Sequence, residues 1–239
     1  MEKSFQALSR MEYPGRIIII GASPAGDDAV IYAITGRSPS SQARRIVVDA
    51  GRTRITVEPT DEKILATGNP DLLVYPAIVI GKGIAVSNGK QTADIALQFK
   101  AGAVPKAVLE NALQSWEYEP DEPNFTPRIS GCVFGAAALS IIKRAPDGSA
   151  ERRYFDVPQL AGGGGLIATY TGANANPLPS FEGGPVDVGI PYRTAAQAAE
   201  ALYAALGPTA GKADLRVAAA AVYRDRGGAI SISVKNRHE

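Results

Sequence analysis

Short runs of apolar, often β-branched residues fill most of the chain, and Gly, Pro, Asn and Asp separate them. Runs of this length and composition are typical of β-strands. Asp147-Gly148 and Gly227-Gly228 each lie between two runs and predict hairpin turns. The predicted strands cover residues 16–22, 29–36, 45–49, 54–58, 72–80, 84–87, 128–134, 138–143, 153–157, 166–170, 215–223 and 230–234.

Only three segments, residues 92–100, 105–116 and 194–206, have a helical pattern. Thr194 can cap the last of these, and Gly207-Pro208 ends it. Pro105 suits the first turn of the second helix, whose apolar positions recur at three- and four-residue spacings. The excess of strands over helices indicates an α+β fold. Since no repeat or long linker divides the chain, we expect one domain over residues 1–239.

Two glycine-rich segments interrupt these elements. The four glycines of residues 162–165 predict a flexible surface loop, although they could also let the backbone approach a phosphate. Residues 171–191 are rich in Gly, Pro and Asn and predict a long irregular connection.

The charge and the Cys and His content exclude several classes of function. Lys and Arg number 25 against 24 Asp and Glu, so a net charge of +1 provides no general attraction to nucleic acid or to a membrane surface. One Cys and one His cannot form a disulfide framework or a structural zinc site. His238 is penultimate, which makes a histidine-based catalytic triad improbable. Cys132 lies in an apolar run and is expected to be a small buried hydrophobe.

Targeting and nucleotide motifs are also missing from the sequence. The first fifteen residues lack the apolar core of a secretory signal, and the run at 17–20 is too short to cross a bilayer, so we expect a cytoplasmic protein. Gly89-Lys90-Gln91 and Gly211-Lys212-Ala213 do not complete a Walker loop, and Gly81-Lys82-Gly83 does not complete a Rossmann fingerprint.

Arginines are concentrated in residues 36–54, where Asp49 is the single acid. Guanidinium groups bind phosphate through paired hydrogen bonds, and Ser-rich residues after Arg37 could add hydroxyl and backbone donors. The alternative is a solvated strand face, above all for the last two arginines of the group. The arginines are Arg37, Arg44, Arg45, Arg52 and Arg54.

Two further polar segments permit both a structural and a functional interpretation. Residues 87–94, Ser-Asn-Gly-Lys-Gln-Thr-Ala-Asp, could simply form a turn and cap a helix, or they could bind an anion and read a purine edge. Residues 117–128 place four acids before Arg128 in a segment stiffened by three prolines. Such acids are usually solvated, but a rigid loop could also hold carboxylates for proton transfer.

Several motifs in this order resemble the archaeal-type IMP cyclohydrolase family over roughly residues 13 to 135. They are Tyr13-Pro14-Gly15-Arg16, Gly36-Arg37-Ser38, Asn69-Pro70 with Tyr75, Ser87-Asn88-Gly89 with Thr92 and Asp94, and Asn124-Phe125-Thr126-Pro127-Arg128-Ile129. The remainder of the chain is similar only in its general strand content.

The resemblance implies a sandwich of two stacked, largely antiparallel sheets between helical layers (αββα), like that of the N-terminal nucleophile hydrolases. It implies closure of formamidoimidazole carboxamide ribotide to inosine monophosphate (IMP) with loss of water, the last step of purine synthesis. The implied partner is a small purine ribonucleotide, without metal or organic cofactor, nucleic acid or membrane. We also expect a homo-oligomer.

Matched position by position, the family pattern implies a set of site residues. Arg37 and Tyr75 are candidate catalytic groups, and Glu119 and Asp121 compete for the role of the catalytic carboxylate. Arg44 is the candidate for phosphate. The other implied substrate-binding residues are Ser38, Asn88, Gly89, Thr92, Asp94, Asn124, Thr126 and Arg128.

Two other functions remain open at this point. A nucleotide-sensing relative could keep the phosphate site without turnover. A true N-terminal nucleophile amidohydrolase would have to cleave itself to expose a Cys, Ser or Thr at a new N-terminus. The candidate cleavage site is the Gly131-Cys132 bond. For Tyr75 the alternative to a role in ring closure is an aromatic side chain that fills the layer between sheet and helix.

Overall fold

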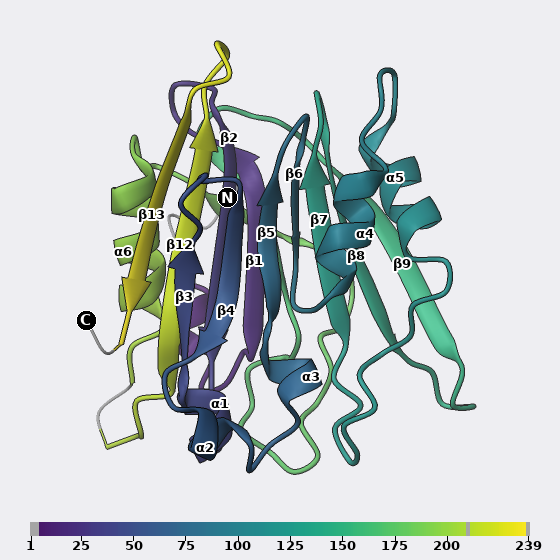
Figure 1. Cartoon of the computed structure of the whole chain (residues 1–239), viewed down its shortest axis with the longest axis vertical. Helices are drawn as coiled ribbons and strands as arrows, with labels where there is room; N and C mark the ends of the chain where they lie inside the picture. The colour runs from purple at the N-terminus through teal and green to yellow at the C-terminus, as the bar shows by residue number, and fades with distance from the viewer. Residues whose placement is uncertain (1–4, 209–210, 238–239) are drawn as a thin grey trace.

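Two antiparallel sheets form the centre of the molecule in the computed structural model, which describes residues 5–208 and 211–237 (Figure 1). His238 lies outside the described residues. Every strand pair within the two sheets is antiparallel. The six-stranded sheet has the order β11 (Val186–Gly189), β10 (Gly163–Ala168), β1 (Arg16–Ala22), β2 (Asp28–Thr35), β12 (Arg216–Arg224) and β13 (Ile230–Asn236). The seven-stranded sheet has the order β3 (Arg44–Val48), β4 (Arg54–Pro59), β5 (Tyr75–Ile80), β6 (Ile84–Ser87), β7 (Arg128–Val133), β8 (Ala137–Arg144) and β9 (Ala150–Val157).

The two sheets pack face to face around one large apolar cluster to which both contribute. Strand β1 is apolar at consecutive positions from Ile17 to Ile20, and all four side chains are fully buried because both faces of this strand are covered. Ile20 packs over Gly131 of β7, where an added Cβ would lie 2.5 Å from its Cδ1. The close approach of the sheets therefore depends on a residue without a side chain at that point.

Helices cover the outer face of each sheet. α6 (Ala195–Ala205) packs on β12, β13 and β2, whereas α4 (Gln91–Leu97) and α5 (Pro105–Ala112) pack on the seven-stranded sheet (Figure 1). This arrangement confirms the predicted αββα layers of an α+β fold. Thr194 caps α6 through the Gln197 N–H, as predicted, and Pro105 begins α5. Both α4 and α5 end three or four residues earlier than predicted.

Short helices gather at one end of the sandwich, the lower end in Figure 1. They are α1 (Pro39–Gln42), α2 (Glu62–Leu65) and α3 (Pro70–Leu73), and the 3-10 helix η1 (Leu8–Arg10) precedes β1. The predicted strand over residues 72–80 is wrong in its first three residues. Asn69 caps α3 through the Asp71 N–H and Pro70 occupies its first turn, so β5 begins only at Tyr75.

The prediction of a loop at Gly162–Gly165 is also wrong. Gly163, Gly164 and Gly165 belong to β10, which pairs with both β1 and β11. A Cβ on Gly21 of β1 would lie 2.1 Å from the Gly163 carbonyl oxygen and 2.5 Å from the Gly164 Cα. The glycines are therefore needed for close strand packing, not for flexibility. The connection over residues 171–191 is mostly irregular, as predicted, but it contains the short strand β11.

The predicted hairpins at Asp147-Gly148 and Gly227-Gly228 are confirmed. They join β8 to β9 and β12 to β13, with Gly148 and Gly228 both at φ +87°. No helix in the described part of the chain has the length and apolar character needed to span a bilayer.

Candidate functional site

A cavity of about 320 Å³ opens at the end of the sandwich where the short helices lie, and we call it the end cavity. Its wall combines segments that are far apart in the sequence: the start of β1, the turn into α1, α3, the loop before β7 and the connection after β10. The charged residues on this wall are Arg16, Arg37, Glu119 and Asp121. Three of these four were predicted site residues, and Arg16 was not.

Arg16 and Glu119 form a buried ion pair on the wall of the end cavity. Nη2 of Arg16 lies 3.1 Å from Oε1 and 2.9 Å from Oε2 of Glu119, and both side chains are more than nine-tenths buried. Burial raises the pKa of Glu119, against the opposing charges of Arg16 and Arg128. A carboxylate whose pKa is raised toward neutrality is a better proton acceptor at physiological pH.

Asn88 holds Glu119 in place from the other side. Its Nδ2 donates to Oε1 of Glu119 at 3.1 Å and to the Pro127 carbonyl at 2.9 Å, while its Oδ1 accepts from the Ile129 N–H at 2.8 Å. The amide also accepts from Nε2 of Gln91 at 3.3 Å. Because these four contacts saturate a fully buried side chain, Asn88 fixes the loop and the carboxylate rather than presenting a free group to the cavity.

Arg128 lies beside this network, with Nη1 at 4.0 Å from Oε1 of Glu119. It donates to the Glu117 carbonyl at 2.8 Å and to Oε1 of Gln91 at 3.3 Å, and its guanidinium lies 4.9 Å from the ring centre of Trp116. Gly89 makes room for the guanidinium, because a Cβ there would lie 2.6 Å from Nη1. The predicted site residue Gly89 therefore contributes to the site by leaving space for Arg128.

Arg37 lies at the mouth of the end cavity and is held by neutral groups. Nη1 donates to the Ala175 carbonyl at 2.7 Å and approaches Oδ1 of Asn174 at 3.4 Å, and the guanidinium lies over the ring of Tyr13. Ser38 caps α1 by accepting from the Ser41 N–H, and both serines line the cavity. The structure thus brings together the guanidinium and hydroxyl groups predicted after β2.

The rest of the predicted basic patch is divided. Arg44 is 2 % exposed, donates to the carbonyls of Ser41 and Thr35, and lies behind the cavity wall. Arg45 is exposed, and Arg52 and Arg54 lie at the opposite end of the β3–β4 hairpin. These last three arginines do not join the site.

The loop before β7 is fixed by its own polar residues. Asp121 accepts from the N–H of Thr126 at 2.6 Å and from its hydroxyl, and the Thr126 hydroxyl also contacts the hydroxyl of Tyr170. Oδ1 of Asn124 accepts from the Leu178 N–H at 3.0 Å, which ties this loop to the connection after β10. Asp121 and Asn124 line the end cavity, whereas Thr126 is buried behind it.

Thr92 and Asp94 have structural contacts away from the end cavity. The Thr92 hydroxyl bonds to Oγ of Ser87 at 2.5 Å and to the Gly89 carbonyl. Asp94 accepts a hydrogen bond from Nε1 of Trp116 at 2.9 Å, and the guanidinium of Arg128 lies over the ring of this tryptophan. The structural interpretation of residues 87–94 accounts for both side chains.

Tyr75 is 2 % exposed at the start of β5, and its hydroxyl lies 2.8 Å from that of Tyr32 on β2. Leu72 and Leu73 of the preceding helix α3 line the end cavity, whereas Tyr75 itself is not one of the lining residues and lies behind them. Strand β5 lies inside its sheet between β4 and β6, so Tyr75 is not at a sheet edge, but the β4–β5 register shifts next to Pro76.

Sequence reasoning missed site residues whose partners come from distant segments. Arg16 belongs to the motif Tyr13-Pro14-Gly15-Arg16 but was not assigned to the site. A charged residue directly before four isoleucines was the feature of the sequence that could have indicated a buried, functional arginine. Tyr32, Tyr170 and Leu178 carried no such signal, because each is an ordinary apolar or aromatic position until the two sheets are stacked.

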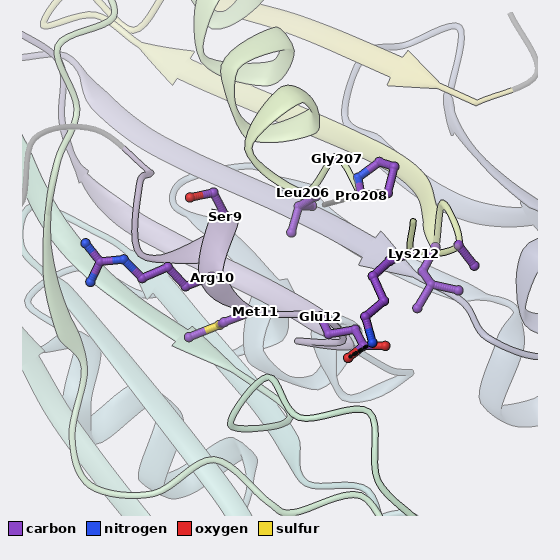
Figure 2. A pocket seen from close by; sticks show the side chains of 10 residues that line it. Ser9, Arg10, Met11, Glu12, Leu206, Gly207, Pro208 and Lys212 are labelled. Carbon is purple, nitrogen blue, oxygen red and sulfur yellow. Dashed lines mark ion pairs between the residues drawn. The ribbon is translucent and has the colours of Figure 1, made fainter. Parts of the chain in front are cut away.

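A second, smaller cavity of about 160 Å³ lies between η1 and the segment after α6 (Figure 2). Its ion pair joins Glu12 and Lys212 at 3.6 Å, and these side chains are 38 % and 55 % exposed. Exposed pairs of this kind contribute little binding or stability, whereas the end cavity carries a buried pair. The end cavity is therefore the stronger candidate.

Comparisons with known proteins identify the family of this chain. A family model described as IMP cyclohydrolase-like protein matches residues 13–228, which extends well beyond the region of resemblance found in the sequence. The IMP cyclohydrolase of Methanopyrus kandleri is 29 % identical over 188 residues, covering 71 % of this chain and 89 % of the relative. That of Halobacterium salinarum is 27 % identical over 195 residues, covering 81 % and 85 %. That of Haloquadratum walsbyi is 33 % identical over 132 residues, covering 55 % and 62 %. The chain therefore belongs to the IMP cyclohydrolase-like protein family.

Proposed function

We propose that this protein is an IMP cyclohydrolase that closes formamidoimidazole carboxamide ribotide to IMP with loss of water. Family membership supports this reaction, since the relatives described above are named IMP cyclohydrolase. The charge balance around the end cavity supports a nucleotide substrate independently of any name.

The observation that carries the proposal is an excess of positive charge held by neutral groups. Four arginines, Arg16, Arg37, Arg44 and Arg128, surround the site, and only Arg16 donates hydrogen bonds to a carboxylate among the contacts of the described residues. Glu119 and Asp121 together neutralise two of these four charges. The two that remain match the charge of a phosphate monoester, which is close to −2 at neutral pH.

We assign phosphate binding to Arg37 and the Ser38 hydroxyl at the cavity mouth, with Arg44 behind them. Arg37 lines the cavity, and its hydrogen-bond acceptors are neutral, so a charged phosphate oxygen can replace them as the stronger partner. Arg44 adds a fixed positive charge through the wall. The base and its reacting groups then extend toward Arg16 and Glu119.

Ring closure requires orientation before it requires strong acids or bases. The carboxamide nitrogen is a poor nucleophile, but it is attached to the same molecule as the formyl carbon, so holding both in the closing conformation removes several kcal/mol of the barrier. The nitrogen–carbon bond forms, the formyl oxygen takes a proton, and this oxygen finally departs as water. Both hydrogens of that water come from the substrate nitrogens.

We assign the proton transfers to Glu119 and Tyr75. Glu119 accepts the proton that the carboxamide nitrogen loses, and its orientation is fixed by Arg16 and Asn88. Tyr75 supplies the proton to the formyl oxygen, and Arg16 stabilises the negative charge that develops there. Asp121 and Asn124 keep the loop in position. No metal or organic cofactor is required for this chemistry.

The decisive experiment follows conversion of the formylated ribotide to IMP spectroscopically at micromolar enzyme. Turnover that stops in Glu119→Gln but persists in Glu117→Gln, an exposed acid two residues away, supports the proposal. IMP binding without any turnover identifies a nucleotide-sensing relative. An intact mass lower than that of the full chain after purification identifies self-cleavage and an amidohydrolase.

We also propose that the protein works in the cytoplasm as a homo-oligomer with a small purine ribonucleotide as its partner. Light scattering coupled to gel filtration tests the oligomeric state, and a mass equal to the 25.0 kDa chain contradicts it.

A further inference from the structure

Two tyrosine hydroxyls meet in the interior behind the end cavity. Tyr32 comes from β2 of one sheet and Tyr75 from β5 of the other, and their oxygens lie 2.8 Å apart. Their exposed fractions are 0 % and 2 %, so both side chains are buried. A buried hydroxyl pair between two sheets is held firmly, because each ring is packed into the common apolar cluster.

The pair has one hydroxyl hydrogen more than its contacts can accept. A single hydrogen bond between two hydroxyls uses one of their two hydrogens. Arg16 on β1, Arg44 on β3 and Arg128 at the start of β7 act electrostatically on the pair, and none of these cations can accept a hydrogen. Nε of Arg16 and Nη1 of Arg44 are themselves buried without a partner among the described residues. The unpartnered side-chain nitrogens in this region are therefore donors.

Either hydroxyl of the pair can donate to the other in this structure. Burial raises the pKa of the Tyr32 hydroxyl well above its ordinary value, with a further rise from Tyr75, against the opposing charges of Arg16 and Arg44. Tyr32 therefore stays protonated, and when it donates to its partner, the Tyr75 oxygen is the acceptor. The hydrogen of Tyr75 is then directed away from Tyr32.

We propose that Tyr32 is a positioning residue for the reaction: its O–H fixes the Tyr75 hydroxyl as a proton donor and stabilises the negative charge left on the Tyr75 oxygen. This inference rests on the proposed function. The O–H bond of Tyr75 breaks, its proton forms a bond to the formyl oxygen, and the electron pair stays on Tyr75. Tyr75 regains a proton from a substrate N–H that is lost in the same ring closure, so the sum of atoms and charge is unchanged.

A double-mutant cycle on turnover tests whether Tyr32 acts through Tyr75. Tyr32→Phe, Tyr75→Phe and the double variant each keep the rings and remove only hydroxyls. We expect Tyr32→Phe to lower kcat at least about tenfold, because a hydrogen bond to a charged oxygen is lost, with KM within twofold of the wild type. We expect the double variant to turn over within twofold of Tyr75→Phe, because Tyr32 has nothing to position once that hydroxyl is absent.

Tyr223→Phe is the matched control. Tyr223 is also buried and donates its hydroxyl hydrogen to the Tyr192 carbonyl at 3.1 Å, but it lies near the end of β12 away from the end cavity. Its loss should lower the melting temperature by a similar amount without lowering kcat. The fluorescence of Trp116, the single tryptophan of the chain, reports IMP affinity, because its ring lies against Arg128.

The outcomes separate this inference from the proposed function. A wild-type protein without turnover of the ribotide overturns both. An active wild type in which Tyr32→Phe behaves like Tyr223→Phe, or in which Tyr32→Phe lowers kcat equally in the presence and absence of the Tyr75 hydroxyl, overturns only the role of Tyr32. A loss of IMP affinity in parallel with kcat also overturns it, because that result identifies a structural defect.

Discussion

Nη2 of Arg16, at the start of β1, donates to both carboxylate oxygens of Glu119 in the loop before β7. The two residues are 103 positions apart in the sequence. Their pairing places one charged residue from each side of the sandwich on the wall of the same cavity. It also means that removal of the Glu119 charge leaves the buried Arg16 guanidinium without a carboxylate partner among the described residues.

Glu119→Gln should therefore lower both stability and turnover. Loss of one partner of a buried ion pair costs about 3–5 kcal/mol, and we expect a decrease of this order in the free energy of unfolding measured in urea. Turnover should fall at least about 10²-fold, since the proton acceptor is lost. Glu117→Gln, which removes an exposed acid from the same loop, is the control. Equal unfolding curves for the two variants would contradict the assigned role of the pair.

Arg37→Ala should weaken IMP binding with little effect on folding. The side chain is only partly buried, and its partners are a carbonyl, an amide oxygen and an aromatic ring. A lost charge-assisted hydrogen bond costs about 1.5–3 kcal/mol, equivalent to roughly a 10- to 150-fold higher Kd. Arg45→Ala makes the same change of charge at an exposed neighbouring position and should bind normally. Titrations that give both variants the same affinity would exclude Arg37 from the phosphate site.

Gly89→Ala should disturb the site without unfolding the protein. The added Cβ would lie 2.4 Å from Oε1 of Gln91 and 2.6 Å from Nη1 of Arg128, both at the ends of flexible side chains that can move aside. We expect a small change in melting temperature, an altered Trp116 emission and up to about 10²-fold slower turnover, as is usual when a site is displaced by about 1 Å. Gly81→Ala, where nothing lies within 4 Å of the added Cβ, is the matched control. Normal turnover in Gly89→Ala would show that Arg128 need not be held in this position.

Cys132 should be unreactive in the folded protein. The thiol is fully buried in β7, and burial raises its pKa to about 12. Only about one thiol in 10⁴ is then ionised at pH 8, and the thiolate is the reactive form. A thiol reagent should label the protein after denaturation and not before. Rapid labelling of the native protein at pH 8 would contradict this placement and reopen the question of a cysteine nucleophile.

Local patterns in the sequence predicted most of the fold correctly. Strands β1 and β6 have the predicted bounds, and nine of the other predicted strands differ from the observed ones by a few residues at their ends. The caps of α5 and α6 were also correct, because Pro105 and Thr194 act on backbone groups within their own first turn. The error at residues 72–73 has a local cause too, since the cap at Asn69 was not included in the interpretation.

Amino-acid composition predicted the structure less well where the distance between neighbouring strands decides which residue fits. Four consecutive glycines are typical of a flexible loop, but Gly163 and Gly164 instead allow β10 to lie against Gly21 of β1. The same limit applies to the site. Arg37, Glu119 and Asp121 were identified by resemblance and do line one cavity, whereas Arg44 was identified and lies behind its wall.

The sequence by itself determined the α+β class, most of the strand positions, the three longer helices and the set of polar residues from which a site could be built. These properties depend on local backbone preferences and on residue types, which are readable one segment at a time. Only the tertiary structure decided that Arg16 pairs with Glu119, that Tyr32 meets Tyr75, and that Arg37 and Arg44 are held by neutral groups. The physical reason is that the energy of a charge or a hydroxyl depends on its burial and on its nearest partners, and stacking the two sheets sets both.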